Sequence, residues 1–234
     1  MNLTSVLSDI VLAALVASPF ILIFVLGEKN MLARAGRIER VRQSKYTTKD
    51  LLFGSRYTAS TVFIWFLFDR LDSIFTQQGW SLVYRDNTQH GWIYFTLSFL
   101  LFFLVYDLWT FSFHFSLHHF KCLRKFHSVH HQNETSPMGA FAFHPVEAVL
   151  FRLPITLAKL FVPLPYSVFV WFYIIVIAHT VYIHMGYDFK GLSTKFILTS
   201  RFHSLHHRNP HHNFGLFFGI WDTFFGTATG VNKK

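Results

Sequence analysis

The stretch from Trp92 to Phe113 constrains the fold most, because its 22 residues include a single charged side chain, Asp107. A helix of that length is about 33 Å long, which is enough to cross the hydrocarbon core of a bilayer. The whole chain has the same character, with 52% hydrophobic and only 14% charged residues among 234. The sequence therefore predicts an integral membrane protein rather than a soluble globule.

Four further apolar segments define the predicted architecture. Ile10–Leu26 is expected to be a membrane helix and not a cleaved signal peptide, because no small-residue cleavage site follows a basic start. Tyr57–Phe68 is too short to span without its polar flanks, so it is either a membrane helix or an interfacial one. Ala148–Val162 and Tyr166–Ile183, separated by Pro-Leu-Pro, predict a helical hairpin. The expected fold is an all-α bundle with about four to five membrane segments.

The basic residues predict the orientation of this bundle. The net charge is +9, and seven Lys and Arg residues lie between positions 28 and 49. They flank apolar segments and form no basic domain, so we expect a cytoplasmic loop and no nucleic-acid partner. Counting four or five passes from that loop places all the clustered histidines on the cytoplasmic face. That membrane would be the endoplasmic reticulum in a eukaryote or the inner membrane in a bacterium.

Histidine is strongly enriched, with 15 residues, and eight of them fall in three short motifs. Their spacings of i, i+4 or i, i+3, i+4 place several imidazoles on one face of a helix. Eight histidines exceed the needs of one metal ion and suit two. The single cysteine excludes a disulfide framework, a Cys-x-x-Cys zinc site and an iron–sulfur cluster. The motifs are His114/His118, His127/His130/His131 and His203/His206/His207.

These motifs carry a family resemblance. In order along the chain, HFSLH, FHSVHH, FHSLHH, NFG and WDTFFGT resemble the fatty acid hydroxylase/sterol desaturase superfamily. SPMGAFAFHPVE and IHMG look most like its sterol C5-desaturase branch. The resemblance covers about residues 105–228. It implies that the histidines form a cytoplasmic helical cap. From the length of the chain we expect a single membrane domain over 1–234, in which helices and a basic loop (1–90) precede the catalytic region (91–228).

The resemblance also implies a di-iron centre whose ligands are its catalytic groups, with no separate acid or base. Asp107 precedes His114 by seven residues and could hydrogen-bond a ligand imidazole or serve helix packing. The second ligand of the first motif could be His118 or His119, with His118 favoured by family spacing. The implied ligands are His114, His118, His127, His130, His131, His184, His203, His206 and His207, with His179 as a further candidate.

Two neighbouring positions stay open at this point. His144 and Glu147 are three residues apart in HPVE, where they could support ligands or cap a helix. Phe115 replaces an Arg that usually follows the first histidine of the family motif. Any anion contact made by that Arg is therefore not expected in this chain.

The implied chemistry is oxidation of a lipid C–H position, as hydroxylation or desaturation, with two Fe²⁺ ions as cofactor and O₂ as co-substrate. The chain has no flavin, haem or iron–sulfur motif. We therefore expect an external electron donor such as cytochrome b5, a ferredoxin or a reductase. Lys121, Arg124 and Lys125 offer docking charge for an acidic carrier, or equally a contact to anionic lipid.

Two alternatives belong to other functional classes. A histidine-rich metal transporter would carry polar groups at the membrane midplane, where this chain offers little besides Asp107 and His179. A bis-histidine haem protein needs one histidine on each of two facing helices, not triplets within one turn.

Overall fold

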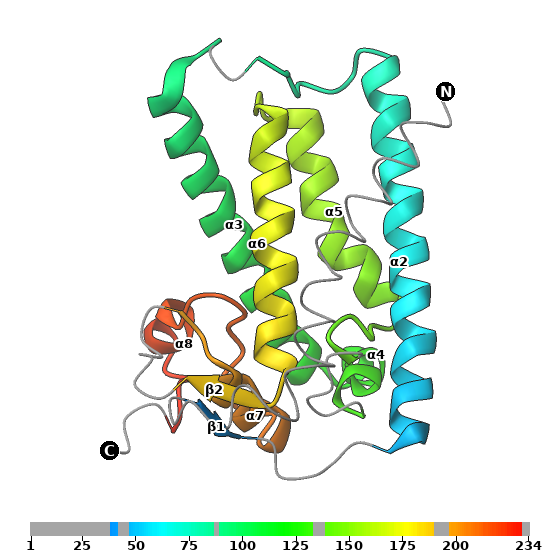
Figure 1. The fold of residues 1–234 in the computed structure, drawn as a ribbon, viewed down its shortest axis with the longest axis vertical. Coiled ribbons are helices and arrows are strands. Elements are labelled where there is room, and N and C mark those ends of the chain that lie inside the picture. Colours follow the sequence, from blue (N-terminus) through cyan, green and yellow to red (C-terminus); the bar gives the residue numbers. More distant parts are fainter. Residues whose placement is uncertain (1–37, 42–46, 87–88, 133–138, 190–196, 231–234) are drawn as a thin grey trace.

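A computed structural model of the chain describes residues 38–41, 47–86, 89–132, 139–189 and 197–230. This part is mostly helical, as the sequence predicts. Four long helices stand along the long axis of the molecule, and the short elements gather at one end (Figure 1). The expected helix at Ile10–Leu26 and most of the basic loop lie outside the described residues.

Three of the long helices are long and apolar enough to cross a membrane: α2 (Thr48–Gln77), α3 (Gly91–His119) and α6 (Tyr166–His184). α2 extends the short segment Tyr57–Phe68 through both polar flanks to 30 residues, or about 45 Å. Most of its apolar window, and most of that of α3, is not buried within the chain. Such outward-facing Leu, Phe and Val side chains are expected to contact lipid.

The predicted hairpin is present as α5 (Pro145–Phe161) followed by α6, with Val162–Pro165 at its tip. α5 is shorter and is not one of the three candidate spans. Pro154 lies inside α5 and has no N–H, which leaves the carbonyl of Leu150 without its helical partner. The indole N–H of Trp109, on α3, donates to that carbonyl at 3.1 Å. The proline is thus accommodated by a neighbouring helix.

A buried polar cluster joins α5 to α2. The guanidinium of Arg152 donates to Asp72 at 2.6 Å and to Asp69 at 2.7 Å. Lys159 donates to the same carboxylate of Asp72 at 2.6 Å. Thr156 donates to Asp72 at 2.8 Å and accepts from Arg152 at 3.2 Å. Each buried charge therefore has an opposite partner, which is the condition for keeping charges away from water.

Replacing Thr156 by Val is expected to weaken this junction. The change keeps the shape of the side chain but removes two buried hydrogen bonds, so we expect a loss of about 1–3 kcal/mol in unfolding free energy. Thermal unfolding in detergent measures it. Thr76→Val is the matched control, because Thr76 is exposed and bonds only to a backbone carbonyl of its own helix. Equal unfolding temperatures of the two variants would contradict the prediction.

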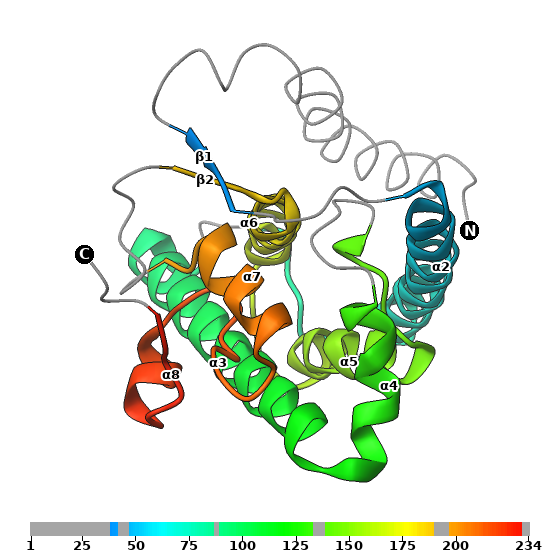
Figure 2. The same cartoon turned by 90° about the horizontal axis from the view of Figure 1, so that it is seen from below.

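The histidine motifs lie together at one end of the bundle. α4 (Lys121–His131) and α7 (Ser200–Arg208) occupy this end, together with α8 (Ile220–Phe224) and an antiparallel pair of strands. In that pair, Ile38 of β1 (Ile38–Arg40) faces Phe189 of β2 (Tyr187–Phe189). Figure 2 looks along the bundle onto α4 and α7. Because α2 and α5 start here while α3 and α6 finish here, every clustered histidine shares this end.

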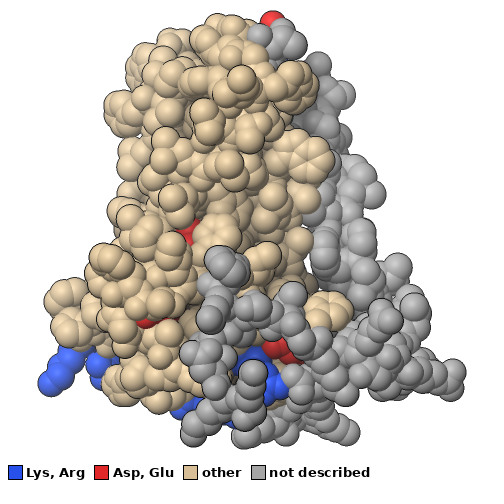
Figure 3. Space-filling view, turned by 90° about the vertical axis from the view of Figure 1, so that its left-hand side faces the viewer, with Lys and Arg blue, Asp and Glu red and all other residues tan. Residues whose placement is uncertain are grey.

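The charged side chains on the face drawn in Figure 3 also lie mainly at the end with the histidine motifs. Its Lys and Arg side chains gather near the end that holds the histidine motifs, and the surface above them is almost uncharged. This distribution suits a protein whose apolar body lies in a membrane and whose basic end contacts water and headgroups. The side of the membrane on which that end lies stays a prediction.

Candidate metal centre

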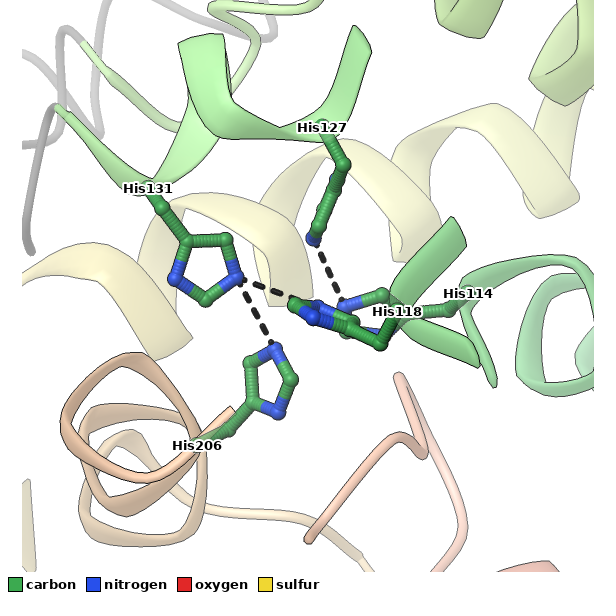
Figure 4. A group of neighbouring side chains, drawn as sticks. All are labelled: His114, His118, His127, His131 and His206. Atoms are coloured by element: carbon green, nitrogen blue, oxygen red, sulfur yellow. Dashed lines mark hydrogen bonds between the residues drawn. The ribbon is translucent and has the colours of Figure 1, made fainter. Parts of the chain in front are cut away.

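All nine histidines predicted as ligands are brought together, in two groups. Within each group, one ring nitrogen per histidine lies within 4.8 Å of all the others. Figure 4 shows the larger group, with rings from three helices converging. The five-histidine group is His114, His118, His127, His131 and His206, and the four-histidine group is His130, His184, His203 and His207.

The helical spacing explains how two motifs serve both groups. On α4, His127 and His131 are four residues apart and belong to the five-histidine group, whereas His130 belongs to the other. On α7 the division is reversed, since His203 and His207 join the four-histidine group and His206 joins the five-histidine group. Each triplet is therefore split between the two sites, a division that spacing alone did not predict.

The hydrogen bonds fix which ring nitrogens are free in the five-histidine group. The Nδ1–H of His114 donates to the carbonyl of Phe214 at 2.7 Å, and the Nδ1–H of His127 donates to Glu147 at 2.7 Å. In a neutral imidazole the other nitrogen, Nε2, then carries a lone pair. The Nε2 atoms of His114 and His127 lie 2.9 Å apart. Two lone pairs that face each other at this distance repel, and a cation that both nitrogens bind would remove the repulsion.

In the four-histidine group, one member, His184, shows the same pattern. The Nδ1–H of His184 donates to the carbonyl of Thr180 at 2.7 Å, so its Nε2 is free. That atom lies 3.0 Å from Nε2 of His203 and 3.3 Å from Nε2 of His130. Two nitrogens bound at right angles to one ion at about 2.1 Å would be about 3.0 Å apart. The donor atoms in both groups thus have the type and spacing that a metal ion requires.

Burial keeps these imidazoles neutral. It lowers the pKa of His131 to about 3, and it lowers the pKa of the other α4 and α7 members well below the usual range. Neighbouring histidines add to this effect, because a second positive charge beside the first is unfavourable. Near pH 7 the rings are therefore ready to bind a metal without losing a proton.

Backbone carbonyls within the NFG motif and just before it orient two of the proposed ligands. The carbonyl of His212 accepts from Nδ1 of His206 at 2.7 Å, as the carbonyl of Phe214 does from His114. The buried carboxylate of Asp222 accepts from the backbone N–H of Phe214 at 2.8 Å and of Gly215 at 2.6 Å. A Cβ on Gly215 would lie 2.7 Å from that carboxylate, which explains the glycine.

Four other predicted residues lie outside both groups. Among the described residues Asp107 has no hydrogen bond to a histidine; it accepts from the N–H of Phe217 at 3.1 Å and from the indole of Trp221 at 2.8 Å, which favours the packing interpretation. His179 bonds to the carbonyl of Leu216 at 2.9 Å. The remaining two are the exposed His119, which stacks on Phe115, and His144, which caps α5.

Glu147, whose role the sequence left open, is a direct neighbour of the centre. Its side chain is fully buried, and one oxygen accepts from His127. Burial alone raises the pKa of this carboxyl, and the charge of a bound cation would oppose that effect.

An apolar cavity adjoins both groups. Its walls include Trp65, Phe141, Phe143 and Phe151, and ligand histidines from each group close one side. An apolar group placed in it would lie against the two histidine groups with little polar surface around it.

Comparison with known proteins identifies the family. The fatty acid hydroxylase family model matches residues 99–227, more than half of the chain. The chain belongs to the fatty acid hydroxylase family. The match includes every histidine of both groups, as well as the segment that supports His114 and His206. No solved structure matches the chain.

Several curated relatives of this fatty acid hydroxylase family member are named for sterol oxidation. Lathosterol oxidase of Mus musculus is 32% identical over 155 residues, 64% of this chain and 52% of that protein. A Delta(7)-sterol-C5(6)-desaturase of Nicotiana tabacum is 28% identical over 163 residues, 67% and 59% respectively. Methylsterol monooxygenase 1 of Danio rerio is 30% identical over 136 residues, 56% and 46%. The chain spans about half the length of the curated relatives it matches.

Proposed function

We propose that this protein is a membrane-bound oxidoreductase that hydroxylates or desaturates a C–H position of a lipid with O₂. The observation that carries the proposal is the convergence of nine neutral imidazoles, in two groups, on one end of an apolar cavity. The nine histidines would hold two Fe²⁺ ions. The names of the relatives favour a substrate of sterol type, and fatty acyl lipids are the second choice.

The residues of this chain contribute binding and orientation. When bound, the iron ions would supply the O₂ activation that attack on an unactivated C–H bond needs. The aromatic cavity walls would bind the apolar substrate and exclude water, so that one carbon lies against the histidine groups. Hydrogen bonds to Phe214, Thr180 and His212 keep the ring orientations fixed. No separate acid or base is proposed.

Electrons would come from an external carrier, such as cytochrome b5, a ferredoxin or a reductase. Lys121, Arg124 and Lys125 are exposed on α4, beside the five-histidine group. Arg124 also donates to the carbonyl of His118 at 2.9 Å, so the basic surface connects directly to the backbone of a proposed ligand. We propose an acidic carrier at this surface, with the histidine end of a multi-pass protein on the cytoplasmic face.

Lipid analysis of cells with and without the active gene tests the proposal. We expect one lipid class to change in mass by +16 for hydroxylation or by −2 for desaturation. Purified protein should then perform the same conversion with O₂ and a reducing system. Binding and movement of metal ions without any lipid product would instead support a histidine-rich transport protein.

A further inference from the structure

Glu147 differs from the other hydrogen-bond acceptors that orient the ligand rings. Its Oε1 atom accepts from Nδ1 of His127 at 2.7 Å, and its side chain is 0% exposed. For His114, His184 and His206 the corresponding acceptor is a backbone carbonyl. Within the described ranges, Glu147 is the carboxylate that contacts a histidine of either group.

The position of Glu147 is built into the start of α5. The residue lies in the first turn, where the helix dipole favours a negative charge. Pro145 begins the helix, and the His144 ring accepts from the N–H of Val146 at 3.2 Å. This cap fixes the first turn and therefore the direction of the carboxylate. Its second oxygen, Oε2, is buried without a hydrogen-bond partner. Glu147 and His127 both line the apolar cavity.

We propose that Glu147 is a positioning residue that polarises His127 and makes the five-histidine ion the more easily oxidised of the two. The inference rests on the proposed di-iron function. A carboxylate that accepts from Nδ1–H makes the opposite nitrogen of the ring a stronger donor to a metal. The surroundings are apolar and buried, so little solvent screens the negative charge. The four-histidine group has no such partner among the described residues.

Glu147→Gln isolates the charge, because the amide oxygen can still accept the hydrogen bond of His127. With ⁵⁷Fe-loaded, fully reduced protein, we expect two Mössbauer doublets, of which the variant shifts one. A redox titration should show two oxidation steps. The step at the lower potential, assigned to the five-histidine ion, should move to a more positive potential in the variant. Glu147→Ala, which also removes the hydrogen bond, should weaken iron binding at the five-histidine group by about 10–100-fold. Asp50→Asn removes an equal charge at an exposed helix cap and should change neither signal.

Unchanged doublets and potentials in Glu147→Gln would overturn the proposal, since a purely structural hydrogen bond would survive in that variant. A shift of both doublets equally would also overturn it. Iron spectroscopy and lipid conversion are separate measurements. If the wild type holds two irons and shows the predicted difference but oxidises no lipid, the proposed function fails while the role of Glu147 stands.

Discussion

His203→Ala and His206→Ala are each expected to reduce the bound iron from two ions per chain to one or fewer and to abolish lipid oxidation. His203 belongs to the four-histidine group and His206 to the five-histidine group, so each variant removes a ligand from a different group. Removing His203 leaves three imidazoles in its group. Elemental analysis of purified protein gives the metal content, and product formation gives the activity.

Two histidines outside the groups are matched controls. His119 directly follows His118 but is exposed, and His179 bonds to a backbone carbonyl. His119→Ala is expected to keep both ions and full activity. His179→Ala should keep both ions with a modest loss of stability. Full iron occupancy in His203→Ala or His206→Ala would contradict the ligand assignment, whatever their activity.

Asp222→Ala is expected to have the largest effect on stability. The carboxylate is buried and accepts three hydrogen bonds, from the backbone of Phe214 and Gly215 and from the hydroxyl of Thr227 at 2.6 Å. Its loss leaves two backbone N–H groups without partners in the interior. We expect a decrease of about 3–5 kcal/mol in unfolding free energy. Because the carbonyl of Phe214 orients His114, iron in the five-histidine group should fall as well.

Thermal unfolding in detergent, followed by iron analysis at low temperature, separates these two effects. Thr227→Val provides the graded comparison, because it removes one of the three hydrogen bonds and should cost about 1 kcal/mol. A variant Asp222→Ala as stable as Thr227→Val would refute the role assigned to this carboxylate.

The proposed ligands could be predicted because their signal is local. Three motifs on helices name eight of the nine members of the two groups, and the order of those motifs indicated the family. The resemblance to that family added His184. The separation of His130 from His127 and His131 could not be predicted, since it depends on which helix faces each side of α4. Asp107 shows the same limit: its partners lie 110 residues or more further along the chain.

The fold was predictable to a similar extent. Hydropathy located α3 and the hairpin, because long apolar segments with few charges have few alternatives in a membrane. It underestimated the length of α2, because that helix includes the polar residues Asp69 and Asp72. Both are stabilised by Arg152 of α5. A hydropathy scale scores each of these three charged residues as unfavourable for membrane insertion. Their mutual compensation exists only in the folded bundle, so the sequence pattern could not include it.

The division of the α4 and α7 triplets between both histidine groups has a consequence for assembly. Neither helix can move without changing both sites, so the two metal positions are mechanically one unit. Binding of the first ion would fix α4 against α7. The ligand nitrogens of the second position would then already be correctly placed. We therefore expect positive cooperativity in metal uptake, with partly loaded protein scarce during maturation.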